Sequence, residues 1–114
     1  MFVPKIDKYT AGMTLASDTE VTMDVITTGE KMQLVRVSVP AGASIPLEVH
    51  DGDQFIRVEL GSATLAYGRG RERKLKLTVD DAVLINQGTW HEITVDKHAP
   101  EPFRFYTLYA PKQH

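Results

Sequence analysis

The stretch ASIPLEVHDGDQFIRVELG, residues 43–61, combines a strand pattern with three residue types that can bind a metal ion. Glu48, His50 and Gln54 fall within seven residues of one another, around an Asp-Gly-Asp turn signal. Alternate side chains of a strand lie on one face, so Glu48 and His50 are expected to point together. We expect a tight hairpin, with Gly52 at positive φ, to bring Gln54 beside them. The stretch predicts either a metal site or a polar strand end beside a solvated hairpin.

Apolar residues elsewhere in the chain alternate with polar ones, which is typical of β-strands. The alternating runs are residues 35–39, 56–60 and 75–79, and residues 23–39 are expected to form two strands joined at positions 28–30. Turn-forming clusters separate these runs roughly every 8 to 12 residues, as in β-sandwiches and barrels. No segment has a convincing helical period. The sequence therefore predicts an all-β fold.

Three segments carry further expectations about this fold. The apolar run AVLIN, residues 82–86, predicts a strand buried on both faces. The segment FRFYTLYA, residues 103–110, has large apolar side chains on both faces, and we expect it to be covered on both sides. Residues 1–20 indicate an irregular arm or an edge strand. Because a second core would be too small to fold alone, residues 1–114 are expected to form a single domain.

Composition excludes several kinds of site and partner. With 42% hydrophobic and 25% charged residues, the chain reads as an ordinary globular protein. It has no cysteine, so a metal would have to be held by nitrogen and oxygen ligands. A net charge of -2 gives no support for a nucleic-acid partner. There is no apolar run long enough for a membrane span or a signal peptide, so we expect no membrane partner and a cytoplasmic location.

A further candidate ligand lies far along the chain, in GTWHEITV, residues 88–95. His91 is in phase with Ile93 and Val95, so it is expected to face inward. An inward histidine needs a partner for each ring nitrogen, either a hydrogen bond or a metal ion. His98 and His114 lie outside these patterns and are expected to be exposed.

The basic run RGRERKLK, residues 69–76, is expected at the tip of a hairpin. It has two interpretations: a patch that binds an anion or a partner, or a solvated loop. Tyr67, Tyr106 and Arg57 are likewise either substrate-contacting groups or packing and surface residues.

The spacing around residues 43–61 resembles the first motif of the cupin family: glycine, five residues, His-x-His, three or four residues, glutamate, six residues, glycine. Here Gly42 is followed at the same intervals by Glu48, His50, Gln54 and Gly61, with two ligand identities changed. The second motif matches less well, since only a glycine and a histidine of it remain within residues 80–95. The chain is similar to small single-domain cupins with glutamine in the usual glutamate position, many of which are described only as cupin-domain or mannose-6-phosphate-isomerase-like proteins.

The resemblance implies a cupin-type jelly-roll β-barrel, or double-stranded β-helix, with core motifs at residues 42–61 and 80–95. It also implies a divalent metal held by Glu48, His50, Gln54 and His91. The family uses three histidines and one carboxylate, so here the carboxylate has moved to the first ligand position. Such ligands suit iron, manganese, nickel, cobalt or zinc without selecting one of them. The metal-free alternative is a hydrogen-bonded cluster at the barrel mouth.

The expected function is that of a small metal-dependent enzyme, a dioxygenase, isomerase or decarboxylase, acting on a small organic molecule. The alternative is a small-molecule-binding or sensor module without turnover. Phe55 is in phase with Arg57 and Glu59 and so is expected to face away from the site. An outward aromatic side chain indicates that this surface is covered by a second subunit or by the N-terminal arm, and we expect a homodimer.

Overall fold

The computed structural model describes residues 4–9 and 17–111, and every regular element within these ranges is a β-strand. The strands are β1 (Thr22–Thr28), β2 (Gln33–Val39), β3 (Ser44–Glu48), β4 (Asp53–Leu60), β5 (Ala63–Tyr67), β6 (Arg73–Leu77), β7 (Ala82–Ile85), β8 (His91–Thr94) and β9 (Phe103–Ala110). No helix that could span a membrane is found in the described ranges. The predicted all-β fold is confirmed.

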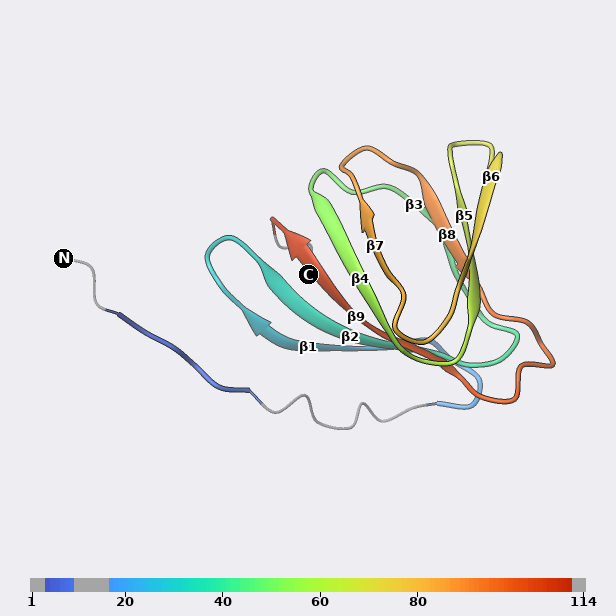
Figure 1. Cartoon of the computed structure of the whole chain (residues 1–114), viewed down its shortest axis with the longest axis horizontal. Helices are drawn as coiled ribbons and strands as arrows, with labels where there is room; N and C mark the ends of the chain where they lie inside the picture. Colours follow the sequence, from blue (N-terminus) through green and yellow to red (C-terminus); the bar gives the residue numbers. More distant parts are fainter. Residues whose placement is uncertain (1–3, 10–16, 112–114) are drawn as a thin grey trace.

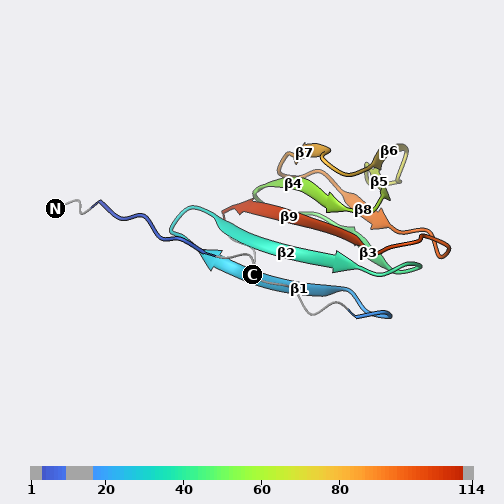
Figure 2. The same cartoon turned by 60° about the horizontal axis from the view of Figure 1, so that its bottom comes forward.

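The strands form two antiparallel sheets that pack face to face (Figure 1). One has five strands in the order β1-β2-β9-β4-β7, and the other has four in the order β3-β8-β5-β6. Figure 2 shows β1, β2, β9 and β4 side by side in one layer, with the second sheet beyond them. The chain crosses between the sheets after β2, β3, β4, β6, β7 and β8, which gives the predicted jelly-roll barrel.

The core lies between the two sheets and follows the alternation of the sequence. Val35 and Val37 of β2, Ile56 of β4 and Phe105 of β9 are each at most 1% exposed. Val37 and Phe105 are cross-strand partners, so the inward rows of neighbouring strands meet. Burial of each such side chain contributes roughly 1.5–3 kcal/mol. The inward phases predicted for residues 35–39 and 56–60 are confirmed.

The two edge strands differ from the predictions for their segments. Residues 82–86 are not buried on both faces, because β7 is the edge of the five-stranded sheet and Leu84 on its outer side is 60% exposed. The strand predicted at 75–79 begins at Arg73 and ends at Leu77, and it is the edge of the other sheet. In contrast, β9 is a central strand with half-buried residues on its outer face.

The turn after β3 is also different from the predicted hairpin. β3 and β4 belong to different sheets, so residues 49–52 cross the barrel rather than join two paired strands. Gly52 is not among the glycines with positive φ. A Cβ atom at this position would instead collide with the side chain of Pro111 and the backbone of Ala110. The crossing places Gln54 on the wall opposite Glu48, and this difference shapes the site.

The described part of the N-terminal segment, residues 4–9 and 17–20, contains no strand, and the edge of the larger sheet opposite β7 is formed by β1. Lys5, Asp7 and Tyr9 line a shallow hollow with residues 27–30 of the β1–β2 connection. The remaining positions of this segment, 1–3 and 10–16, lie outside the described residues.

Candidate metal centre

Glu48 and His91 face each other across two neighbouring strands. Glu48 ends β3, His91 begins β8, and their Cα atoms are cross-strand partners. Such partners share one face of the sheet, here the inner one. The predicted inward orientation of His91 is confirmed, since it is 1% exposed.

His50 reaches the same place from the crossing segment, two residues beyond β3. Its backbone carbonyl accepts a hydrogen bond from the Gly88 N–H (3.0 Å). Next to it, the Gln87 N–H donates to Asp53 Oδ1 (2.9 Å). These two bonds tie the loop before His91 to the crossing that carries His50. The histidines are therefore held in place by the same pair of loops.

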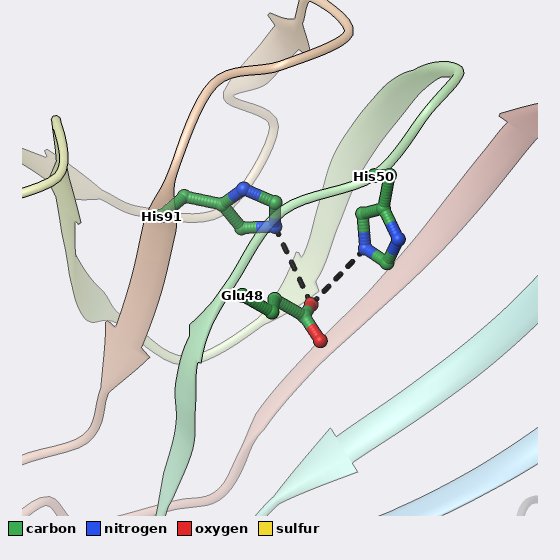
Figure 3. A group of neighbouring side chains, drawn as sticks. All are labelled: Glu48, His50 and His91. Carbon is green, nitrogen blue, oxygen red and sulfur yellow. Dashed lines mark hydrogen bonds and ion pairs between the residues drawn. The ribbon is translucent and has the colours of Figure 1, made fainter.

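The Glu48 carboxylate lies between the two imidazole rings (Figure 3). Its Oε1 atom is 3.3 Å from His50 Nε2 and 3.4 Å from His91 Nε2. One ligand atom from each of the three residues lies within 4.8 Å of the others. Ligands about 2.1 Å from a common ion are separated by roughly 3 to 4 Å, so both carboxylate-imidazole separations fit a shared ion.

The tautomer of His91 supports a cation at this point. His91 Nδ1 is 2.9 Å from the Thr89 carbonyl oxygen, which can only accept, so Nδ1 carries a proton. In a neutral ring Nε2 is then a lone pair, and it is buried and forms no hydrogen bond within the described chain. Glu48 Oε1 lies 3.4 Å from His91 Nε2, but the two atoms do not form a hydrogen bond. Without a cation, the lone pair of Nε2 would face the negative charge of the carboxylate, which is unfavourable. A metal ion between these two atoms, with Thr89 orienting the ring, would satisfy both.

Gln54 adds a further acceptor from the opposite wall. It is 3% exposed, and its Nε2 donates to Thr107 Oγ1 (3.0 Å) and to the Tyr109 hydroxyl (3.4 Å). Its Oε1 is buried and forms no hydrogen bond to a described residue. Because an unpaired buried carbonyl oxygen is costly, this atom also calls for a cation or a donor. The inward phase of Gln54 is as predicted, and its assignment as a ligand remains a proposal.

Burial and charge tune two acidic groups at the site. Burial by itself would raise the pKa of the Glu48 carboxyl, but its contacts with the imidazole rings of His91 and His50 outweigh this effect and hold the pKa below its ordinary value of 4.5. The carboxylate is therefore ionised at neutral pH. Burial, together with the negative charge of Glu48, raises the pKa of Tyr109 to about 12, although Thr107 opposes this through a hydrogen bond. The Tyr109 hydroxyl thus keeps its proton and can act as a donor.

The other candidates from the sequence separate into two groups. Tyr67 faces inward as the cross-strand partner of His91. Arg57 and Tyr106 are cross-strand partners in the outward phase of β4 and β9, so they lie away from the site. His98 is exposed, as predicted, and His114 lies outside the described residues.

Tyr109 and Thr89 contribute to the site but were not singled out from the sequence. Tyr109 shares the inward phase of Phe103 and Phe105, so its phase was readable although its role was not. Its ring lies edge-on to His50, with the ring centroids 5.2 Å apart. Thr89 acts only through its backbone carbonyl, for which a sequence carries no signal.

A cleft of about 350 Å³ opens next to His91, between β7 and the β5–β6 hairpin. Its walls combine aliphatic side chains with polar groups; the lining residues are Leu65, Tyr67, Leu75, Val83, Leu84, Ile85, Asn86, Thr89 and His91. Glu48 and His50 do not line it. The cleft has the size and polarity typical of a site for a small organic molecule.

Comparison with known proteins agrees with this geometry. Residues 35–109 match the family described as Cupin domain. The protein is a cupin. This cupin is 36% identical over 91 residues to uncharacterized protein L612 of Acanthamoeba polyphaga mimivirus. The aligned region covers 79% of this chain and 56% of that protein. The chain thus spans little more than half the length of that curated relative.

Two solved structures show the same fold. A Bacillus halodurans protein matches with a TM-score of 0.74 and 34% identity, over 79% of this cupin and 70% of that chain. An RmlC-like cupin family protein with a double-stranded β-helix fold, from Methanocaldococcus jannaschii, matches with a TM-score of 0.75 and 16% identity, over 95% and 94% of the two chains. The resemblance predicted from the sequence motifs is confirmed.

Proposed function

We propose that this cupin binds a divalent metal through Glu48, His50 and His91, with Gln54 as a neutral fourth ligand, and acts as a small enzyme on a small organic molecule. The observation that carries the proposal is the buried Nε2 lone pair of His91, fixed by Thr89 and directed at a carboxylate oxygen. Two histidines and one carboxylate suit iron(II), manganese, nickel, cobalt or zinc and leave positions open for a substrate.

Each residue of the chain at this site has a separate role. A bound divalent ion supplies Lewis acidity or, as iron, oxygen chemistry. Glu48 contributes the negative charge, and Thr89 holds His91 in its ligand tautomer. Tyr109 keeps its proton, and its hydroxyl oxygen accepts a hydrogen bond from Gln54 Nε2 that helps to orient the Gln54 side chain. The cleft beside His91 would orient the substrate and exclude water.

The lining of the cleft favours one reaction class. Among the described residues that line it there is no carboxylate and no lysine. An isomerase would therefore have to use Glu48, itself a ligand, as the proton acceptor, and a decarboxylase would need a proton donor for the carbanion that loss of carbon dioxide leaves. An oxygen-dependent cleavage depends less than these reactions on a separate acid or base from the protein, so we favour a dioxygenase. The alternative is a module that binds its ligand without turnover.

Turnover measurements test this choice. We expect the iron(II)-loaded cupin to consume oxygen with at least one member of a panel of diketones, catechols and sugar derivatives, and the His50→Ala variant to be inactive. Nickel- and manganese-loaded protein, assayed for isomerised or decarboxylated products, covers the other classes. Saturable binding with no product for any metal would support the binding module and count against the enzyme.

The homodimer remains a proposal as well. On the outer face of the five-stranded sheet, Leu34, Leu108, Phe55 and Leu84 are successive cross-strand partners and form one apolar row. Phe55 is 39% exposed, so no described segment of the chain covers it fully. In a two-fold symmetric dimer, this row of one protomer would pack against the same row of its partner. The row therefore favours a second copy of the chain as the covering partner.

Size-exclusion chromatography with light scattering tests the proposed dimer. We expect a dimer for the wild type and a shift toward monomer for Leu84→Glu, because the variant would bury a charge at the interface. Met23→Glu is a suitable control, since Met23 is 45% exposed but lies on β1, in the phase of inward-facing Val37. If both variants elute like the wild type, this face is not the interface.

A further inference from the structure

A row of four side chains crosses the inner face of the four-stranded sheet at its site end. Glu48 pairs with His91, His91 pairs with Tyr67, and Tyr67 pairs with Arg73. Cross-strand partners share a face, so Arg73 belongs to the same row as two of the proposed metal ligands. With strands about 4.8 Å apart, the Arg73 backbone lies roughly 10 Å from that of His91.

Arg73 differs from the other arginines of the β5–β6 hairpin. Arg69 stacks on the Trp90 ring, 5.6 Å from its centroid, and Arg71 donates to Glu92 Oε1 at 3.1 Å. The Arg73 guanidinium makes no hydrogen bond or ion pair with any residue in the described part of the chain. Its charge is therefore available to a ligand.

Two adjoining hollows lie between Arg73 and His91, one of the proposed metal ligands. The first is the cleft that contains His91. The second, of about 470 Å³, is lined by Arg69, Arg73 and Trp90. Tyr67 and Thr89 line both hollows, so a molecule could extend from one into the other.

The second hollow has a positive balance of charge. Its lining includes two arginines and one carboxylate, that of Glu72. Glu72 Oε1 already accepts a hydrogen bond from the Gly70 N–H (3.0 Å). An anionic group would thus meet an unpaired guanidinium beside a carboxylate that is already engaged.

We infer that Arg73 is a specificity-determining residue for an anionic substrate: a small molecule with a metal-binding head, an apolar body and a carboxylate or other anionic group at its far end. This inference rests on the proposed function, because it places the head of the substrate at the metal centre. It assigns a role to one residue of the basic hairpin and leaves the outward lysines of β6 as solvated charges.

A matched pair of catechols tests the inference by calorimetric titration of zinc-loaded protein. The pair is 3-(3,4-dihydroxyphenyl)propionate and 4-propylcatechol, which share the head and body but differ in the charge of the tail. We expect the wild type to bind the carboxylate about tenfold more tightly than the propyl compound, as one charge-assisted hydrogen bond to the exposed Arg73 allows. In Arg73→Gln this preference should fall below about twofold, with the affinity for 4-propylcatechol unchanged.

Two further variants separate a specific contact from general charge. Arg73→Lys should keep part of the preference, because the positive charge remains at the same position. Lys76→Gln removes one charge from the same strand, but from a side chain on the outer face of the sheet. This variant should keep the full preference for the carboxylate over 4-propylcatechol. If Lys76→Gln loses as much as Arg73→Gln, or if Arg73→Gln keeps the tenfold preference, the inference is wrong.

Titrations of protein from which a chelator has removed the metal separate two failures: that of the role given to Arg73 and that of the proposed metal centre. Repeating the titrations with metal-free protein should weaken both catechols by the same factor. If removal of the metal changes neither affinity while the Arg73-dependent preference persists, the anion site stands and the metal centre does not bind the head. If both catechols need the metal but show no preference, or if neither binds at millimolar concentration, the substrate class is overturned.

Discussion

Replacing His91 with alanine is expected to abolish stoichiometric metal binding. This residue supplies the buried nitrogen whose lone pair is fixed toward the shared point by the Thr89 carbonyl. Loss of a residue that only orients a ligand costs about 10- to 100-fold in metal affinity, so loss of the ligand itself should cost more than about 100-fold. Metal analysis after reloading and removal of excess ion measures this directly.

Thermal unfolding gives a second measure of the same prediction. A saturating ion at about 100 times its dissociation constant stabilises the folded state by about 2.7 kcal/mol. We expect the wild type to show a metal-dependent rise in Tm that a chelator reverses, and His91→Ala to show none.

Two variants keep the prediction testable if His91→Ala folds poorly. His50→Ala removes a ligand whose side chain is more accessible than that of His91 and should also lose the metal. His98→Ala removes an exposed histidine outside the site and should bind the metal as the wild type does. Equal metal content in all four proteins would show that Glu48, His50 and His91 form a hydrogen-bonded cluster instead.

Gly61→Ala is expected to be the most destabilising of the small substitutions at glycine. Gly61 has a φ of +78°, and its missing side chain faces the Pro102 carbonyl and the Phe103 backbone. An L-residue in this left-handed conformation costs about 1–2 kcal/mol. The Cβ atom would also collide with the Pro102 carbonyl oxygen and displace the start of β9, where Phe103 is fully buried. We expect a total cost of at least about 3 kcal/mol.

Gly88→Ala is a matched control for this prediction. Gly88 has a nearly identical φ of +79°, but a Cβ atom there would meet nothing within 4 Å. The control should therefore lose only the conformational contribution of about 1–2 kcal/mol. Urea unfolding at unchanged m-value compares the two variants. Equal shifts in midpoint would show that the backbone contact at Gly61 adds nothing.

Much of the fold followed from local patterns in the sequence. Alternation marked the strands around Val37 and Ile56 and their inward faces, because a half-buried strand must repeat every second residue. The same reasoning was wrong for Leu84 and for the turn at Gly52. An apolar run does not say whether its strand is central or at an edge, and a turn does not say whether the chain stays in one sheet.

The sequence by itself determined the phases that turn Glu48, His50 and His91 toward one another. Each phase depends only on neighbours a few residues away, whereas the set of four metal ligands stays a prediction. Only the tertiary structure decided that Gln54 approaches from the opposite wall.

The partners of these side chains were likewise set by the fold. The Thr89 carbonyl fixes the His91 tautomer, and Arg73 closes a row that begins at Glu48. These relations join residues distant in the chain through backbone groups and strand order, which no local pattern of side chains encodes.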